Sequence, residues 1–275
     1  MFENVEAFYR PGSIPEALRL FQTGNGAARF LAGGTDLINQ ADRKVRTLID
    51  LSQLGLSYVR KNEDGWVIGA TTTIAELESA AVLRKLAGGI LQRAAAQSGP
   101  LQVRNMATIG GRLLQPSASA EIATVLLALD ATVVLACAKR RMKIPLVDLS
   151  SSDCKMLLLE IAIPTTPSGG RWSFEKLGRV ESDISLVNVA AGLQTDRKGT
   201  CKWARIAVGG LGKCAAHVRA AESLLVGRRL NSTLIDVAAD AVAAAVHPVS
   251  SIRGSADYLR EMAGVLTRRA LAGCV

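Results

Sequence analysis

The sequence predicts an α+β fold with two domains, and three observations support this class. Before residue 164 short strand patterns are mixed with helix patterns, whereas after residue 170 three strand patterns precede three helix patterns. A segment rich in proline, threonine, serine and glycine, residues 164–170, separates the two parts. The chain has 275 residues, 49% of them hydrophobic, which is enough apolar material for two modest cores. We expect a first domain at residues 1–166 and a smaller second domain at residues 171–275.

The first domain is expected to contain two α/β units, whose helix starts are marked by capping residues. Ser13 and Glu16 form a capping box with Pro15 in the first turn, and Thr73 and Glu76 form a second one. Helices are expected at 14–21, after residue 73, at 82–97 with a weak centre at Gly88–Gly89, and at 120–129. Strands are expected at 28–31, 47–51, 66–70, 131–137 and 155–163.

The second domain shows the order of patterns that is typical of a sheet covered by helices. Apolar and polar residues alternate in three stretches, as they do in half-buried antiparallel strands, at 171–176, 186–194 and 204–208. Alanine-rich stretches with helical periodicity follow near 215–226, 232–246 and 254–272. This part therefore predicts an α+β domain with an antiparallel sheet.

Charge and hydropathy exclude two classes of partner. The formal net charge is +9, from 33 basic and 24 acidic residues, but the basic residues are spread along the chain, so nucleic-acid binding is not predicted. The longest apolar stretch, residues 122–138, contains Asp130 and is shorter than the roughly 20 apolar residues of a membrane span. We interpret it as a buried helix followed by a buried strand. With no secretory signal at its start, the chain is expected in the cytoplasm.

Cysteine and histidine usage predicts no metal site. The five cysteines, at positions 137, 154, 201, 214 and 274, form no C-x-x-C pair, so we expect neither a disulfide framework nor an iron–sulfur or zinc site from this chain. His217 and His247 stand alone and are expected in helices, at the surface or at helix ends. There is no G-x-S-x-G motif and no cysteine–histidine neighbour, so no residue of this chain is predicted to be catalytic.

Two segments with paired glycines are the strongest candidates for a ligand site. Residues 31–37 contain Gly33–Gly34, residues 107–112 contain Gly110–Gly111, and each segment is expected to follow a short strand. Paired glycines allow a tight turn in which successive N–H groups converge on an anion. Either segment alone is better explained as a plain tight turn. Two of them, about 75 residues apart, favour a dinucleotide diphosphate.

A third glycine segment is interpreted differently. Gly210–Ala215 matches the G-x-G-x-x-A pattern of dinucleotide-binding βαβ units. Such a unit needs a second parallel strand and an acidic residue about 20 positions further on. Here Glu222 comes too early and the chain continues into a helix. We interpret the segment as a strand-to-helix turn.

Taken together, these motifs resemble the flavin-binding (medium) subunit of the molybdenum hydroxylases, the family that includes xanthine dehydrogenase and aerobic carbon monoxide dehydrogenase. The resemblance covers nearly the whole chain and lies in the order and spacing of several short motifs. They are Ala32–Leu37, Ala107–Gly111, Leu126–Ala131, Phe174–Arg179, Asp183–Ala190, Ala207–Gly210, Ser255–Arg260 and Arg268–Leu271.

The resemblance implies a two-part FAD-binding domain of the PCMH type at residues 1–166 and a C-terminal domain of the CO dehydrogenase flavoprotein type at residues 171–275. It implies that the two glycine segments clasp the FAD diphosphate. The FAD-binding residues carried over from the family's motifs are Leu31, Ala32, Gly33, Gly34, Thr35, Asp36, Leu37, Thr108, Ile109, Gly110, Gly111, Arg112, Glu121, Leu158 and Lys176. Without the resemblance, Lys176 is better explained as a solvated lysine on a strand.

Two positions depart from the family's usual pattern. The family has Asn where this chain has Arg112, and Asp where it has Glu121. Arg112 either pairs with the diphosphate, which is a charge-assisted contact that Asn cannot make, or obstructs the site by its bulk. A third interpretation is a compensating salt bridge between Arg112 and Glu121.

The resemblance also implies partner chains. Molybdopterin and [2Fe–2S] clusters are expected in a large molybdopterin-binding subunit and a small [2Fe–2S] subunit, joined with this chain in a dimer of heterotrimers. The chain would bind FAD and carry electrons from those clusters to a final acceptor. Two other hypotheses are a flavin-deficient structural or assembly paralogue in the same kind of complex and a stand-alone flavin oxidase.

Overall fold

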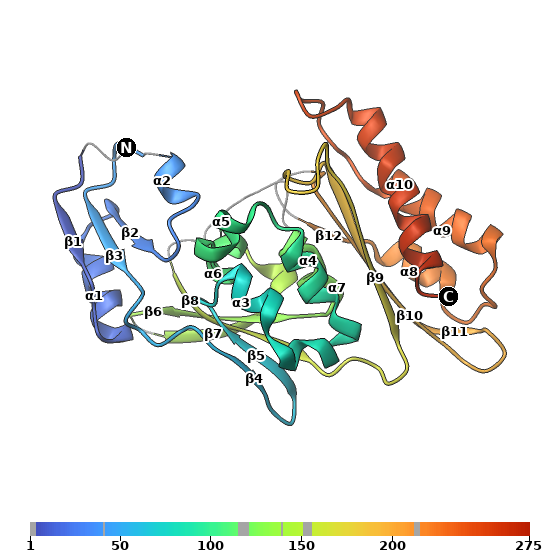
Figure 1. The fold of residues 1–275 in the computed structure, drawn as a ribbon, viewed down its shortest axis with the longest axis horizontal. Helices are drawn as coiled ribbons and strands as arrows, with labels where there is room; N and C mark the ends of the chain where they lie inside the picture. The colour runs from blue at the N-terminus through green and yellow to red at the C-terminus, as the bar shows by residue number, and fades with distance from the viewer. Residues whose placement is uncertain (1–3, 41, 115–120, 139, 151–155, 212–214) are drawn as a thin grey trace.

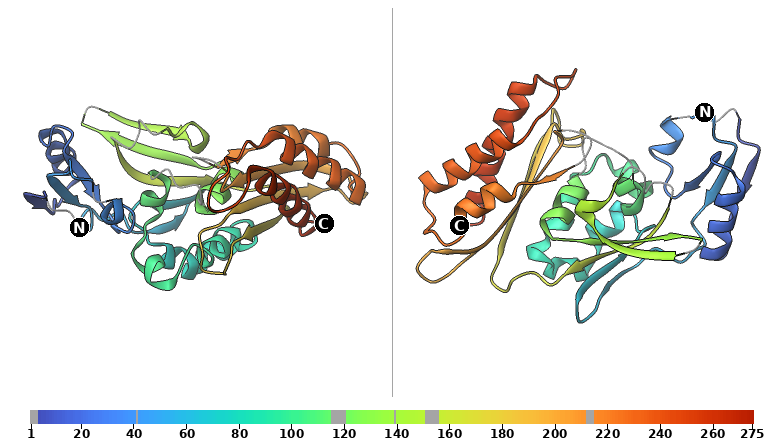
Figure 2. Two further views of the ribbon diagram at one scale, coloured as in Figure 1. Left: turned by 90° about the horizontal axis from the view of Figure 1, so that it is seen from above. Right: turned by 180° about the vertical axis from the view of Figure 1, so that it is seen from behind.

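A computed structural model describes residues 4–40, 42–114, 121–138, 140–150, 156–211 and 215–275 of the chain (Figures 1 and 2). Three sheets follow one another along the long axis of the molecule, in the order of the sequence. The first two belong to the N-terminal half, and the third forms the C-terminal domain together with three helices. The predicted fold class, a mixed two-domain protein with antiparallel sheets, is confirmed.

The N-terminal sheet is small and parallel. Its three strands, in the order β1-β3-β2, are β1 (Ala7–Tyr9), β2 (Ala28–Leu31) and β3 (Thr47–Asp50), and its helices are α1 (Ile14–Thr23) and α2 (Leu37–Gln40). Ser13 caps α1 by accepting a hydrogen bond from the Glu16 N–H, as predicted. Ala17 and Ile49 are fully buried in a core shared with Leu157, so this unit packs directly on the next sheet.

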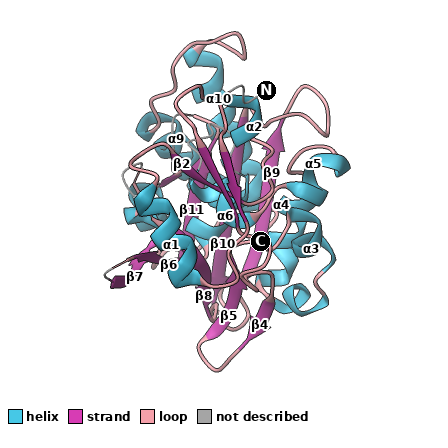
Figure 3. Cartoon of the chain, turned by 90° about the vertical axis from the view of Figure 1, so that its left-hand side faces the viewer, coloured by secondary structure: helices cyan, strands magenta, loops and turns pink. Residues whose placement is uncertain are grey.

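The second sheet is antiparallel and has helices on one face. Its strand order is β4-β5-β8-β6-β7, with β4 (Val59–Lys61), β5 (Gly65–Gly69), β6 (Thr132–Cys137), β7 (Arg140–Pro145) and β8 (Leu157–Pro164). The helices are α3 (Ile74–Ser79), α4 (Ile90–Ala96), α5 (Leu101–Met106), α6 (Ile109–Leu114) and α7 (Glu121–Ala128). Seen from the N-terminal side, α3, α4 and α5 gather on one side of the strands (Figure 3).

The C-terminal domain is an antiparallel sheet with helices on its outer face. Its strand order is β12-β11-β10-β9, with β9 (Arg171–Leu177), β10 (Val187–Thr195), β11 (Cys201–Gly209) and β12 (Ala216–His217). The helices α8 (Arg219–Leu225), α9 (Ser232–Ala245) and α10 (Ala256–Ala272) cover the face that points away from the rest of the chain (Figure 1). The order of strands followed by helices was predicted.

The inner face of the C-terminal sheet packs on the helices of the first domain. Trp172, Phe174 and Ala190 belong to the same buried core as Val125 of α7 and Ile161 of β8. Helix α7 therefore lies between two sheets, which is why all but one of its eight residues are buried. This explains the long apolar stretch of the sequence, which is a buried helix followed by the strand β6, as predicted.

Two predicted elements are wrong. The stretch 82–97 is broken into two short 3₁₀ helices (Ala81–Lys85 and Ala87–Gly89) and α4, because Gly88 and Gly89 have φ of +63° and +76°. The segment around Gly110–Gly111 is not a turn after a strand: it lies in helix α6, which follows helix α5. Short apolar runs do not distinguish a strand from a helix, and here tertiary hydrogen bonds decide.

The short helices α2 and α5 were not predicted, and the remaining differences lie at sheet edges and element ends. The edge strands β1, β4 and β12 were missed because they have only two or three residues, and the edge strand β7 because three of its six residues are basic. The predicted starts at Ala120 and Lys155, and part of the turn Gly210–Ala215, lie outside the described residues. Among the described helices, none is long and apolar enough to cross a membrane.

The close contact between the domains predicts a strong effect of a single methyl group. A Cβ at Gly209 of β11 would overlap Thr124 Oγ1 of α7 and lie 2.7 Å from Asn188 Oδ1. We expect Gly209→Ala to lower the free energy of unfolding by about 1–3 kcal/mol, because the added atom forces the sheet away from the helix. Chemical denaturation with the full chain measures this change.

The matched control is Gly12→Ala, since nothing lies within 4 Å of a Cβ at that position. It should change the stability by no more than about 0.5 kcal/mol. Equal effects of the two substitutions would show that the contact at Gly209 is not a close one.

Candidate functional site

A cleft lies where the N-terminal sheet meets the second sheet and its helices. Its walls come from the end of β2 and the loop after it, from the segment 107–112, and from the start of β8. The space between these walls, including the part open to solvent, is about 1130 Å³. The predicted site residues that line the cleft are Ala32, Gly33, Gly34, Thr35, Asp36, Leu37, Thr108, Gly110, Gly111, Arg112 and Leu158.

The two glycine segments lie close together because the glycines at their contact have no Cβ. A Cβ at Gly33 would overlap the carbonyl oxygen of Met106, so the backbone of the first segment lies directly against the backbone that leads into the second. Gly34 has a φ of +71°, in the left-handed region that favours glycine. A Cβ at Gly110 would lie 2.7 Å from the Ala70 carbonyl oxygen, so the second segment is packed equally closely on the end of β5.

The backbone N–H groups of the two segments are used differently. In the second segment, the N–H groups of Ile109 and Gly110 donate to the carbonyl oxygens of Thr72 and Ala70, at 2.9 Å each. Gly111 N–H donates to Thr108 Oγ1 at 3.2 Å. In the first segment, the described residues provide no acceptor for the backbone N–H groups of residues 32–36. The first segment therefore has the donors that an anion needs, while the second supplies the floor of the cleft.

The charged side chains of the cleft are Arg29, Asp36 and Arg112. Arg29 is 3.4 Å from Asp42 and donates to two backbone carbonyl oxygens. Arg112 differs, because its Nε is buried and has no hydrogen-bond partner among the described residues. A buried donor without a partner costs free energy, so an anion that reached it would be bound favourably.

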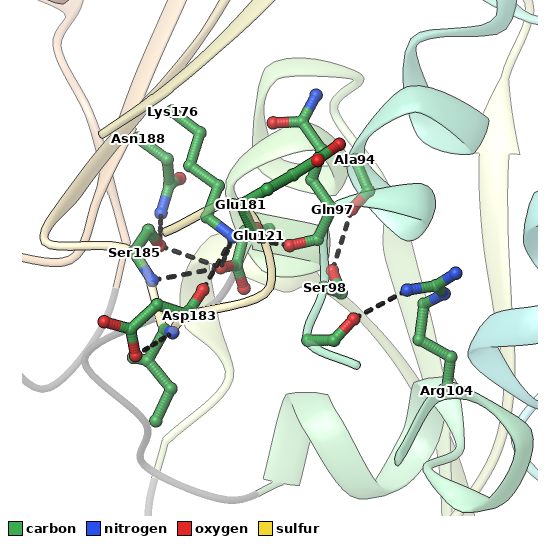
Figure 4. A network of polar contacts seen from close by, with 12 residues as sticks. Ala94, Gln97, Ser98, Arg104, Glu121, Lys176, Glu181, Asp183, Ser185 and Asn188 are labelled. Carbon is green, nitrogen blue, oxygen red and sulfur yellow. Dashed lines mark hydrogen bonds and ion pairs between the residues drawn. The ribbon is translucent and has the colours of Figure 1, made fainter. Parts of the chain in front are cut away.

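Four predicted site residues do not line the cleft. Leu31 ends β2 next to the loop, and Ile109 is fully buried beneath the second segment. Glu121 and Lys176 lie at the contact between the two domains, in a separate polar network (Figure 4).

Lys176 is the centre of this network. Its Nζ donates to the carbonyl oxygens of Gln97 at 2.6 Å, Asp183 at 2.7 Å and Glu181 at 3.2 Å, and lies 3.6 Å from Glu121 Oε1. The two side chains are 4% and 6% exposed, so Lys176 is not a solvated strand lysine. Its three carbonyl partners satisfy the ammonium group, which is what a buried charge requires.

Glu121 is held from the other side by Ser185 and Asn188. Its Oε1 accepts hydrogen bonds from Ser185 Oγ at 2.9 Å and from Ser185 N–H at 3.3 Å, and Asn188 Nδ2 donates to Ser185 Oγ at 2.8 Å. Glu121 therefore pairs with Lys176 and not with Arg112. The network joins Gln97 and Glu121 of the first domain to the second domain.

Similarity to known proteins agrees with this geometry. Residues 2–166 match the family described as "FAD binding domain in molybdopterin dehydrogenase", and residues 172–273 match "CO dehydrogenase flavoprotein C-terminal domain". The chain belongs to this family.

Proteins similar over almost the full length include subunits and a solved structure. The chain is 34% identical to the 6-hydroxypseudooxynicotine dehydrogenase complex subunit alpha of Paenarthrobacter nicotinovorans, over 94% of this chain and 91% of that subunit. It is 29% identical to the nicotinate dehydrogenase FAD-subunit of Eubacterium barkeri, over 92% and 90%. A carbon monoxide dehydrogenase structure from Hydrogenophaga pseudoflava aligns with a TM-score of 0.93 and 29% identity, over 100% of this chain and 98% of that one. The chain is thus an oxidoreductase subunit that binds FAD.

The cleft residues fit FAD. The diphosphate needs several hydrogen-bond donors, and the N–H groups of residues 32–36 together with Arg112 Nε are donors without partners among the described residues. An aromatic and aliphatic wall, which includes Phe30, Leu51 and Met156, fits the flat rings of the cofactor.

Sequence reasoning missed part of this wall. The lining residues that were not predicted are Phe21, Arg29, Phe30, Gln40, Leu51, Ala70, Thr71, Ala107, Leu114, Met156 and Leu157. Phe21 and Phe30 stack with ring centroids 4.4 Å apart. Their positions beside the first glycine segment offered a signal: Phe30 stands just before the loop on the predicted strand 28–31.

One histidine was placed wrongly: His217 lies on strand β12 and not in a helix. His247 is exposed just after the end of α9, so it lies at the surface and at a helix end, as predicted. His217 is nearly buried, with Nε2 3.3 Å from Glu222 Oε1, and burial lowers the pKa of its imidazole. Among the described residues there is no group of three or more potential metal ligands.

Breaking the buried pair should destabilise the protein strongly. Lys176→Met leaves the Glu121 carboxylate buried without its cation and frees three carbonyl oxygens. We expect a loss of about 3–5 kcal/mol in the free energy of unfolding, measured by chemical denaturation.

Lys202→Met is the control, because Lys202 also lies on the C-terminal sheet but forms an exposed ion pair with Asp196. This change should cost less than about 1 kcal/mol. A similar small cost at Lys176 would mean that water reaches the network.

Proposed function

We propose that this chain is the electron-transfer subunit of a molybdenum hydroxylase complex, and that it passes electrons from [2Fe–2S] clusters of a partner chain to a final acceptor. The observation that carries the proposal is the cleft in which the loop 32–36 offers unused N–H groups opposite Arg112. FAD supplies a ring system that accepts and releases electrons singly or in pairs. The chain's residues bind the cofactor, exclude water from one side of it and leave another side open.

The proposed FAD contacts are the eleven predicted residues that line the cleft. We propose that Glu121 and Lys176 act as positioning residues, because their network fixes the loop that contains Glu181 and Asp183 beside the first domain. Arg179 donates to the Asp183 carboxylate at 2.7 Å and lowers the pKa of that group, so the carboxylate stays charged on this loop. We also propose that the first domain ends at residue 166 and that the second begins at residue 171.

The partners follow from the family. We propose a large molybdopterin-binding subunit and a small [2Fe–2S] subunit, assembled with this chain as a dimer of heterotrimers. Relatives belong to a 6-hydroxypseudooxynicotine dehydrogenase complex, a nicotinate dehydrogenase and a carbon monoxide dehydrogenase, so closely similar chains serve different substrates. This diversity favours a substrate site on a partner subunit.

We place the complex in the cytoplasm. The buried cysteines Cys201 and Cys274 form no disulfide, which agrees with a reducing compartment. A flavin-deficient paralogue is a weaker proposal. Donors without a hydrogen-bond partner around the cleft cost free energy, and a bound cofactor would satisfy them.

The first test is the flavin content of the purified complex. We expect flavin absorption bands and about one FAD released by acid per chain, because the cleft holds one dinucleotide. Chromatography of the released compound identifies it. A pure complex without flavin, which also takes up no added FAD, would contradict the proposal.

The glycine loop provides a sharper test. Gly34→Ala places a Cβ on a residue with φ of +71°, 2.9 Å from Ile38 Cδ1, so the loop must change its conformation and its N–H groups no longer converge. We expect the Kd for FAD to rise about tenfold, which corresponds to the roughly 1–2 kcal/mol of backbone strain. Fluorescence titration with FAD measures it.

Gly169→Ala is the matched control. Gly169 has a similar φ of +77° with open space around its Cβ position, and it lies outside the cleft. The same backbone strain should therefore lower the stability and leave the Kd for FAD unchanged. If Gly34→Ala and Gly169→Ala changed the Kd for FAD equally, the loop 32–36 would not be part of the cofactor site.

A further inference from the structure

A second groove lies between helix α1 and the adjacent ends of β6 and β7 (Figure 1). Three arginines line it, Arg19 of α1 together with Arg140 and Arg141 of β7. Its other lining residues are mostly apolar and include Leu18 and Ala136. None of the residues that line this groove also lines the cofactor cleft, so FAD binding gives the groove no role.

The positive charges of the groove have no counter-charge. Among the described residues, no ion pair includes Arg19, Arg140, Arg141 or the neighbouring Lys143 of β7. All four residues are exposed. Like charges that gather on one surface produce a positive potential, so this surface is complementary to an acidic partner.

The strand β7 is also a free edge of its sheet. The Leu146 N–H donates to the Ala131 carbonyl oxygen at 2.8 Å, and the hydrogen-bonded pairs of β6 and β7 alternate from there. The backbone N–H and C=O groups of Arg141 and Lys143 therefore point away from β6, toward the open edge. An extended peptide can pair with such an edge as an added strand.

The two faces of β7 differ in character. Arg141 pairs with Ala136 of β6, which shares a core with α1, so Arg141 and Lys143 point to the side of the sheet where α1 lies. Met142 and Ile144 point to the opposite side. An added strand in which acidic and apolar residues alternate thus places its carboxylates beside the basic residues and its apolar side chains beside Met142 and Ile144.

Other occupants fit this edge less well. Pairing β7 with the β7 of a second copy would bring basic side chains together, and like charges across a strand pair are destabilising. The acidic residues of this chain are scattered, since Glu63–Asp64 is the one place where two are adjacent. Nucleic acid offers charge along its backbone, but it has no edge that pairs with a strand and no apolar side chains for the groove.

We propose that the edge of β7 and the groove beside α1 bind an extended acidic segment of another polypeptide, which pairs with β7 as an added strand. This interaction surface goes beyond the proposed function and does not depend on FAD binding. The partner is recognised by its backbone at Arg141 and Lys143 and by its carboxylates at the arginines of the groove.

The test uses the full chain and a labelled peptide of about ten residues in which glutamate and valine alternate, with fluorescence anisotropy as the readout. A second peptide has the same sequence but a methyl group on every backbone nitrogen, so it keeps the charge and cannot donate hydrogen bonds. The variants are Arg19→Glu and Arg141→Glu. The control is Arg84→Glu, which makes the same charge change at an exposed arginine outside the groove.

We expect the acidic peptide to bind the wild type at low salt. Arg19→Glu and Arg141→Glu should each raise its Kd about tenfold, because repulsion replaces attraction. Arg84→Glu should leave the Kd unchanged. The methylated peptide should bind the wild type about tenfold more weakly or worse, because it cannot pair with β7.

Three results would overturn the proposal. If the acidic peptide does not bind the wild type, or binds no better than the methylated peptide, β7 accepts no added strand, and this comparison needs no variant to fold. If Arg84→Glu weakens binding as much as the groove variants do, the peptide responds only to the overall positive charge. If a DNA oligonucleotide binds more tightly than the peptide and is weakened by Arg19→Glu and Arg141→Glu, the groove is a nucleic-acid site instead.

Discussion

The backbone of Gly33 lies against the backbone at Met106, and the cleft depends on this contact. It brings a loop of the parallel N-terminal sheet beside the helices of the antiparallel sheet, although the two segments are far apart in the sequence. Any side chain at Gly33 would force them apart. The tertiary hydrogen bonds of Ile109 and Gly110 hold the second segment in place, so the loop 32–36 is positioned against a fixed surface and its N–H groups remain available.

The domain contact is built from two kinds of interaction with different roles. The apolar part, with Trp172 and Phe174 packed on the helices of the first domain, supplies most of the driving force for association. The buried Lys176–Glu121 pair contributes little net free energy because both charges lose their hydration. Its value is in orientation, since its hydrogen bonds are satisfied only when the loop 181–185 lies beside Gln97.

This arrangement is compatible with the different substrates after which the relatives of this chain are named. The cofactor cleft lies within the first domain, and its donors come from one loop and one helix. Among the described residues there is no group of three or more potential metal ligands, and the residues that line the cleft fit the binding of a cofactor.

The sequence by itself determined the local structure and the family. Ser13 and Thr73 cap helices where predicted, because their hydrogen bonds connect residues only three positions apart, although the full reciprocal capping box forms only at Thr73. The three long strands of the C-terminal domain were predicted from alternation, although β10 is buried on both faces, since Val189 and Ala190 belong to different cores. The two glycine segments were selected from the five glycine pairs of the chain, and the resemblance to the family supported that choice.

The tertiary structure alone decided what those segments do. Only the fold shows that the Ile109 and Gly110 N–H groups are used internally while those of residues 32–36 are not, because their acceptors come from residues about 40 positions away. Only the fold pairs Glu121 with Lys176 and leaves Arg112 without a carboxylate. The sequence shows which groups can carry a charge or donate a hydrogen bond, whereas burial and distance decide which of them have a partner.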